Sequence, residues 1–107
     1  MAITRNQAAE WNHWTPSEVK IIDGVVVKYL DVLVHTFRLG DVEDPEIYVA
    51  GPIYEWQKTD AGRWVMDHSV KEPYWTKRMD YHSYGYECNI FARLRESDAV
   101  FFNLKFK

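Results

Sequence analysis

Histidine and carboxylate side chains are the residues of this chain best suited to chemistry. Imidazoles occur at His13, His35, His68 and His82, and His82 has the carboxylate of Asp80 two residues before it. An imidazole can carry a proton near neutral pH, so His35, His82 and Asp80 are the candidates for general acid–base catalysis. The spacing matches no metal-binding signature such as His-Glu-x-x-His, and we expect neither a metal nor a cofactor.

Motifs for covalent catalysis and nucleotide binding are missing from the sequence. It contains no Gly-x-Ser-x-Gly, no phosphate-binding loop and no dinucleotide fingerprint. The single cysteine, Cys88, excludes an internal disulfide, and we expect a small buried side chain there rather than a reactive thiol. His35 lies on an apolar strand, where a histidine more often belongs to a core or an interface. The sequence therefore favours a protein that is not an enzyme, and leaves an enzyme open.

Aromatic side chains are the other candidates for a site. The 107 residues include five tryptophans, seven tyrosines and five phenylalanines. Trp56, Trp64, Trp75 and Tyr84 could line a pocket or stack on bases. Tyrosine and tryptophan also bury large areas at little rotamer cost, so core and interface packing is the more common role. We expect packing, with these four residues as the binding candidates.

Charge and hydropathy exclude some kinds of partner. The formal net charge is −3, and six acidic residues lie between positions 41 and 60 against one lysine. Such a surface repels phosphate, so nucleic-acid binding is not expected. No run approaches the 18 apolar residues of a membrane span, and the first residues lack the apolar segment of a signal peptide. The sequence predicts a cytoplasmic protein without a membrane partner.

Hydrophobic periodicity predicts two hairpins and two helical regions. β-branched runs flank Asp23-Gly24, the dipeptide typical of a two-residue hairpin turn. The expected elements are a hairpin over 19–27, a strand over 29–39, a helical stretch over 53–68 with a possible break at Thr59, strands over 74–79 and 86–94, and a helix from 96 to about 104. The last of these could also be a strand by its alternation, but its acidic start favours a helix.

The expected strands over 29–39 and 86–94 carry apolar side chains on both faces, so each face should be buried by other residues. Cys88, Ile90, Ala92 and Leu94 occupy alternate positions of one strand and should face the core. The opposite face should carry Leu33, His35, Phe37 and Phe91. Because single domains rarely expose large apolar patches, we expect a homodimer with Leu33, Phe37 and Phe91 in its interface.

The order of these elements indicates one α+β domain over residues 1–107, with an N-terminal arm over 1–18. An antiparallel or mixed sheet with helices on one face would give a ferredoxin-like sandwich.

Residues 34–106 resemble small uncharacterised proteins of marine tailed bacteriophages. The similarity lies in Asp-Val-Glu-Asp-Pro-Glu (41–46), Glu-Trp-Gln-Lys-Thr (55–59), Gly-Arg-Trp-Val-Met-Asp-His (62–68) and Ser-Asp-Ala-Val-Phe-Phe-Asn-Leu-Lys-Phe (97–106). The resemblance implies a viral origin and hence the host cytoplasm, but it carries no known activity or catalytic residue.

Three functions remain from the sequence. The leading one is a small non-enzymatic interaction protein that acts as a homodimer through an aromatic or acidic surface. The alternative is a small-molecule-binding protein or cofactor-independent enzyme of the dimeric ferredoxin-like type, with a pocket between helix and sheet and His35 or His82 as proton carrier. Single-strand nucleic-acid binding through exposed aromatics is the weakest. Fold alone does not decide among them.

Overall fold

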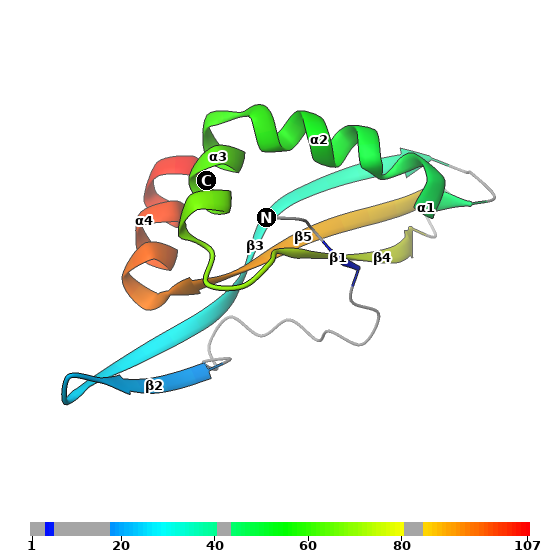
Figure 1. Ribbon diagram of the computed structural model, residues 1–107. Helices are drawn as coiled ribbons and strands as arrows, with labels where there is room; N and C mark the ends of the chain where they lie inside the picture. The colour runs from blue at the N-terminus through cyan, green and yellow to red at the C-terminus, as the bar shows by residue number, and fades with distance from the viewer. Residues whose placement is uncertain (1–3, 6–17, 41–43, 81–84) are drawn as a thin grey trace.

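The computed structural model describes residues 4–5, 18–40, 44–80 and 85–107, and shows two β-hairpins with helices between and after them (Figure 1). Its elements in chain order are β1 (Thr4–Arg5), β2 (Glu18–Ile22), β3 (Val25–Gly40), α1 (Pro45–Tyr48), α2 (Ala50–Lys58), α3 (Asp60–His68), β4 (Tyr74–Asp80), β5 (Gly85–Arg95) and α4 (Glu96–Phe106). The predicted α+β class is confirmed. The predicted arm falls mostly on residues 6–17, which lie outside the described residues.

The five strands form one sheet in the order β1-β4-β5-β3-β2. Neighbouring long strands are antiparallel, and the two residues of β1 pair in parallel with the start of β4. The sheet curls, with α2 over its concave side and α3 and α4 at one end (Figure 1). A ferredoxin-like sandwich is not confirmed, because the chain completes one hairpin, then the helices, then a second hairpin, instead of alternating strands with crossover helices.

The first hairpin turns at the predicted dipeptide. Asp23 and Gly24 both have positive φ, at 51° and 78°, as a type I′ turn requires, and glycine adopts this conformation without strain. β2 then pairs along the first residues of β3, from Ile22 beside Val25 to Glu18 beside Tyr29. β3 continues without a break into the centre of the sheet, so the predicted hairpin and strand form one continuous element.

The helical stretch is broken at Thr59, as predicted. Oγ1 of Thr59 accepts a 3.0 Å hydrogen bond from the backbone N–H of Gly62 and so caps α3. Gly62 lies where α3 meets the end of α2, and a Cβ there would overlap the carbonyl oxygen of Trp56. The close approach of the two helices therefore requires glycine at this position, despite its low helix propensity.

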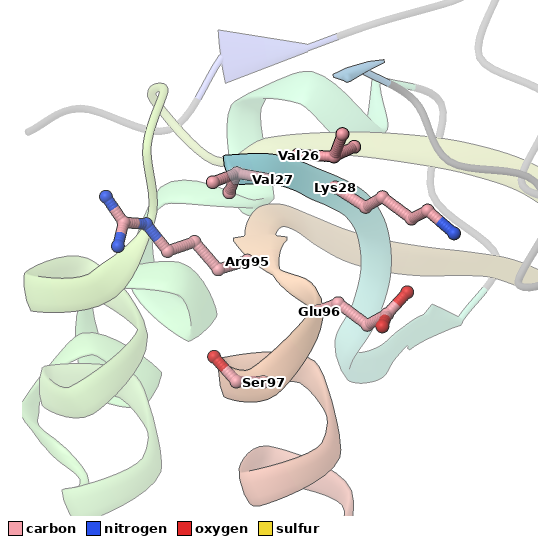
Figure 2. Close-up of a pocket in the computed structure, with 6 residues that line it drawn as sticks. All are labelled: Val26, Val27, Lys28, Arg95, Glu96 and Ser97. Carbon is pink, nitrogen blue, oxygen red and sulfur yellow. The ribbon is translucent and has the colours of Figure 1, made fainter. Parts of the chain in front are cut away.

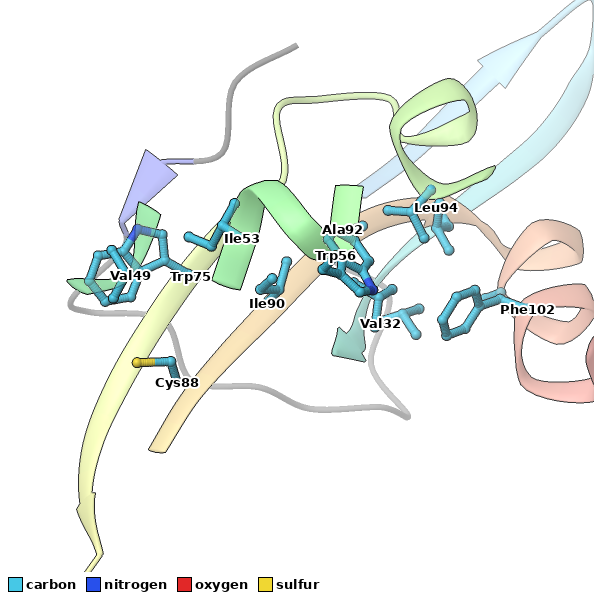
Figure 3. Packing of buried hydrophobic residues seen from close by; sticks show 13 residues of the cluster. Val32, Val49, Ile53, Trp56, Trp75, Cys88, Ile90, Ala92, Leu94 and Phe102 are labelled. Carbon is cyan, nitrogen blue, oxygen red and sulfur yellow. The ribbon is translucent and has the colours of Figure 1, made fainter. Parts of the chain in front are cut away.

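The core lies between the concave face of the sheet and the helices (Figure 3). Cys88, Ile90, Ala92 and Leu94 are all fully buried on this face, which confirms the predicted alternation of β5. The helices contribute the other side of the core, with Ile53 and Trp56 from α2, Val65 from α3, and Ala99 and Phe102 from α4.

A β-bulge in β3 corrects one prediction. Leu33 pairs with Phe91 and His35 pairs with Ile90, so Val34 is an extra residue in β3. Beyond the bulge the alternation of β3 is reversed, because a shift of one residue moves every side chain to the other face. The prediction that His35 and Phe37 lie on the outer face with Leu33 and Phe91 is therefore wrong. His35 and Phe37 lie on the core face.

Candidate functional site

His35 is the one catalytic candidate whose side chain the structure describes. Its imidazole stacks on the indole of Trp56 from α2, with ring centroids 5.6 Å apart and planes at 15°. It also lies 6.1 Å from the ring of Phe37. Burial lowers the pKa of His35 from its ordinary value, which favours the neutral imidazole. Trp56 fills the space between this imidazole and the helix, so His35 is placed as a packing residue of the α2–sheet contact.

Three other candidates are not placed. The side chains of Asp80, His82 and Tyr84 lie outside the described residues. Within the residues that the structure does describe, no three histidine, cysteine or carboxylate side chains come together as a metal site would require. Cys88 is fully buried, and burial raises the pKa of its thiol to about 11, so the thiol form persists at neutral pH.

The three tryptophan candidates are packing residues. Trp56 and Trp75 are buried in the core. Trp64 is half-buried and stacks on His68 of its own helix at 4.1 Å and on Phe101 of α4 at 5.3 Å. Trp56 and Trp75 belong to one buried core cluster, and Trp64 packs against that cluster between α3 and α4. They support the packing role over the binding role.

A polar network crosses the outer face of the sheet, the face without helices. Arg93 of β5 donates from Nε to Oδ1 of Asp31 on β3 at 2.8 Å, and from Nη1 to Oε2 of Glu18 on β2 at 3.4 Å. Tyr74 of β4 donates its hydroxyl proton to Oδ2 of Asp31 at 2.9 Å. The network thus joins four strands with hydrogen bonds between side chains.

The electrostatics of this network leave little capacity for chemistry. Burial raises the pKa of Tyr74 well above its ordinary value, and the neighbouring Asp31 carboxylate adds to the shift. The hydrogen bond with Asp31 also raises the pKa of the Arg93 guanidinium above its ordinary value. A cavity of about 200 Å³ lies beside the network, lined by Asp31, Lys71, Glu72, Tyr74 and Arg93. Both carboxylates of the network are bonded to Arg93, so we interpret it as a clamp on the sheet rather than as a catalytic centre.

The same network covers the aromatic residue that was predicted to lie in a dimer interface. Phe91 does project from the outer face, but the ring of Tyr74 stacks on it at a centroid distance of 5.4 Å. Phe91 is 5% exposed within a single chain. With Phe37 on the core face and Phe91 covered by Tyr74, Leu33 is the one member of the predicted trio that lies half-buried on the outer face. Among the described residues, Phe91 is therefore not an exposed apolar side chain of the outer face.

Exposed apolar side chains gather instead on the first hairpin. Residues 18–28, the hairpin arm, project past the helices at one end of the molecule (Figure 1). The arm exposes five large apolar side chains, and they lie on both of its faces: Val19, Ile21, Ile22, Val25 and Val26. The outer edge of β2 is also an edge of the sheet.

A second group of exposed apolar side chains lies on α4. The helix buries Ala99 and Phe102 in the core, and its opposite side exposes Val100, Phe101 and Leu104, the α4 outer face. Val100 and Leu104 are four residues apart and therefore lie on one side of the helix. Leu104 is 81% exposed, the highest value among the large apolar residues described.

The arm and α4 border one hollow of about 450 Å³ (Figure 2). Val26, Val27 and Lys28 line it from β3, and Arg95, Glu96 and Ser97 line it from the junction of β5 and α4. Its lining residues are mostly exposed, so it is an open depression between two projecting elements. This end of the molecule is the candidate interaction surface.

No protein-family model, curated protein or solved structure matches the chain. No helix within the described ranges is long and apolar enough to span a membrane. The surface must therefore be judged on its own chemistry.

Sequence reasoning identified the hairpin but overlooked its exposure. A hairpin with one face on the core alternates apolar and polar residues, whereas residues 19–27 are apolar on both faces. That pattern is typical of a hairpin that projects from the body. In the structure, the first residues of β3 extend past the helices and so have no cover.

Proposed function

We propose that this chain is a non-enzymatic interaction protein that acts as a homodimer, with the hairpin arm in the contact. The observation that carries the proposal is the exposure of five large apolar side chains on an arm that projects from the body. Monomeric proteins rarely leave contiguous apolar patches of more than a few hundred Å² in water, and larger ones mark interaction sites.

An unpaired strand edge adds to the case for the arm. The outer edge of β2 has no neighbouring strand among the described residues, and natural proteins commonly protect such edges with charge or proline. β2 carries two charged side chains, Glu18 and Lys20, which pair with each other, and Ile21 is 74% exposed. An edge of this kind is suited to contact with another chain.

The enzymatic alternative gains no support from the described residues. It placed His35 or His82 as a proton carrier in a pocket between helix and sheet. The imidazole of His35 is stacked against Trp56, and His82 lies outside the described residues. Localisation in the cytoplasm, of a host if the chain is viral, remains part of the proposal.

Light scattering with variants of the arm tests this function. The wild-type chain should have twice the mass of one 12.7 kDa chain at micromolar concentration. Ile21→Lys should shift the mass towards the monomer with little change in melting temperature, because Ile21 contributes little to the core. The matched control is Ile47→Lys on α1, also exposed but at the other end of the molecule, which should remain a dimer. A monomeric wild type, or an Ile21→Lys variant that stays dimeric, contradicts the proposal.

A further inference from the structure

Two exposed apolar surfaces lie at the same end of the molecule, and neither is large enough to hold two copies together alone. The hairpin arm exposes five large apolar side chains and the α4 outer face exposes three. A stable interface takes about 800 Å² from each partner, which is far more than one face of an 11-residue helix supplies. A contact that used both surfaces of each copy would come much closer to this requirement.

We infer that the hairpin arm of one copy packs on the α4 outer face of a second copy, and that the second arm packs in return on the first α4. This inference rests on the proposed homodimer and names the partner surface within it. Twofold symmetry makes each contact occur twice, so every apolar residue of both surfaces is covered by one assembly. Side-by-side pairing of two arms would leave Leu104 and Val100 in water.

The shape of this end permits the exchange. The hollow of about 450 Å³ lies at the base of the arm and reaches the first turn of α4. Val26 of the arm and Ser97 in the first turn of α4 both line it, so the arm and the start of α4 border the same open space (Figure 2). In the inferred exchange, the arm of a second copy approaches α4 from this side.

Some charges of the two surfaces can pair in one orientation. The arm carries Lys20 and Lys28, an acid at its tip, Asp23, and an acid at its base, Glu18, which is paired within the chain with Lys20 at 3.3 Å and with Arg93 at 3.4 Å. The first turn of α4 carries Glu96 and Asp98, and its last residues carry Lys105 and Lys107. An arm that lies along the partner's helix with its base at the first turn places Lys28 near Glu96 and Asp98, and Asp23 near Lys105 and Lys107. Opposite charges at the rim favour this orientation over the reverse.

Chemical cross-linking between two single-cysteine variants tests the exchange. Chains with Ile21→Cys and chains with Leu104→Cys are mixed, allowed to exchange subunits and treated with a short bismaleimide. A cross-linked dimer is expected in the mixture and in neither variant alone. The native Cys88 is fully buried, and wild-type chain treated in the same way measures any cross-linking through Cys88.

The control pair is Ile47→Cys mixed with Leu104→Cys, which should give no cross-linked dimer because α1 lies at the other end of the sheet (Figure 1). Light scattering of the same samples separates the two proposals. A dimeric mass with cross-linking of Ile21→Cys to itself, and none to Leu104→Cys, overturns the exchange and leaves the homodimer standing. A monomeric mass overturns both.

Discussion

The hydroxyl of Tyr74 donates a 2.9 Å hydrogen bond to Asp31 across the intervening strand β5, and its ring lies against Phe91 on the way. One side chain therefore links β4 to β3 and shields the largest apolar group of the outer face. This relationship joins two strands on the face of the sheet that carries no described helix.

Tyr74→Phe should keep the ring on Phe91 and remove the hydrogen bond. The expected loss is about 1 kcal/mol in the free energy of unfolding, since Asp31 remains bonded to Arg93 and is not left alone. Urea denaturation followed by circular dichroism measures it. Tyr54→Phe, on the exposed side of α2, is the matched control and should change stability by less than about 0.5 kcal/mol. Equal losses in both variants would show that the hydroxyl of Tyr74 is not part of a clamp.

Two glycines in helices should respond to alanine in opposite directions. Gly62→Ala forces a Cβ into the Trp56 carbonyl, so we expect a net loss of about 1–3 kcal/mol. Gly51 in α2 has open space around it, and Gly51→Ala should gain up to about 1 kcal/mol from helix propensity. Thermal melts of both variants check the pair. A stabilised Gly62→Ala would mean that α2 and α3 do not approach as closely as described.

His35 should make the fold sensitive to mild acid. Burial lowers the pKa of His35 in the folded chain from its ordinary 6.5, so the unfolded chain binds a proton more readily than the folded one. Its contribution to stability is therefore complete above about pH 6.5 and is lost as the pH falls below that value. Urea midpoints at pH 7.5 and pH 5 should differ more in the wild type than in His35→Gln. An equal difference in the wild type and in His35→Gln would show that His35 is not the group responsible.

Removal of metal ions should leave the protein unaffected. No cluster of potential ligands occurs among the described residues, and structural zinc sites contribute several kcal/mol of folding free energy where they exist. Dialysis against a chelator should therefore shift the melting temperature by less than about 1 °C. A large decrease would point to a site built with His82 or the neighbouring residues.

Local signals in the sequence were sufficient for most of the elements, because each depends on a few adjacent residues. Asp23-Gly24 specifies its own turn, and Thr59 caps the helix that begins beside it. The outer face depends on register, which no local signal gives. Val34 is apolar like its neighbours, so nothing in the alternation marks it as the bulge that turns Phe37 towards the core.

The candidate site was harder to predict, because exposure depends on where the helices end. Phe91 looked as though it needed a partner copy until its pairing with Tyr74 was known. Conversely, the sequence of the apolar arm is typical of a buried part of the sheet, and its exposure follows only from the position of the helices, which do not cover it. In both cases the missing information was a contact between segments distant in the sequence.

The central pairing of β3 with β5 also has a consequence for how the chain folds. It joins residues as far apart in the sequence as Tyr29 and Arg95, whereas the first hairpin joins immediate neighbours around Asp23. Local pairings close quickly and distant ones slowly, because a long loop must first lose its freedom. The hairpin arm should thus close earlier in folding than the pairing of β3 with β5. An isolated two-stranded hairpin is only marginally stable in water, so the arm becomes persistent once β5 pairs with β3.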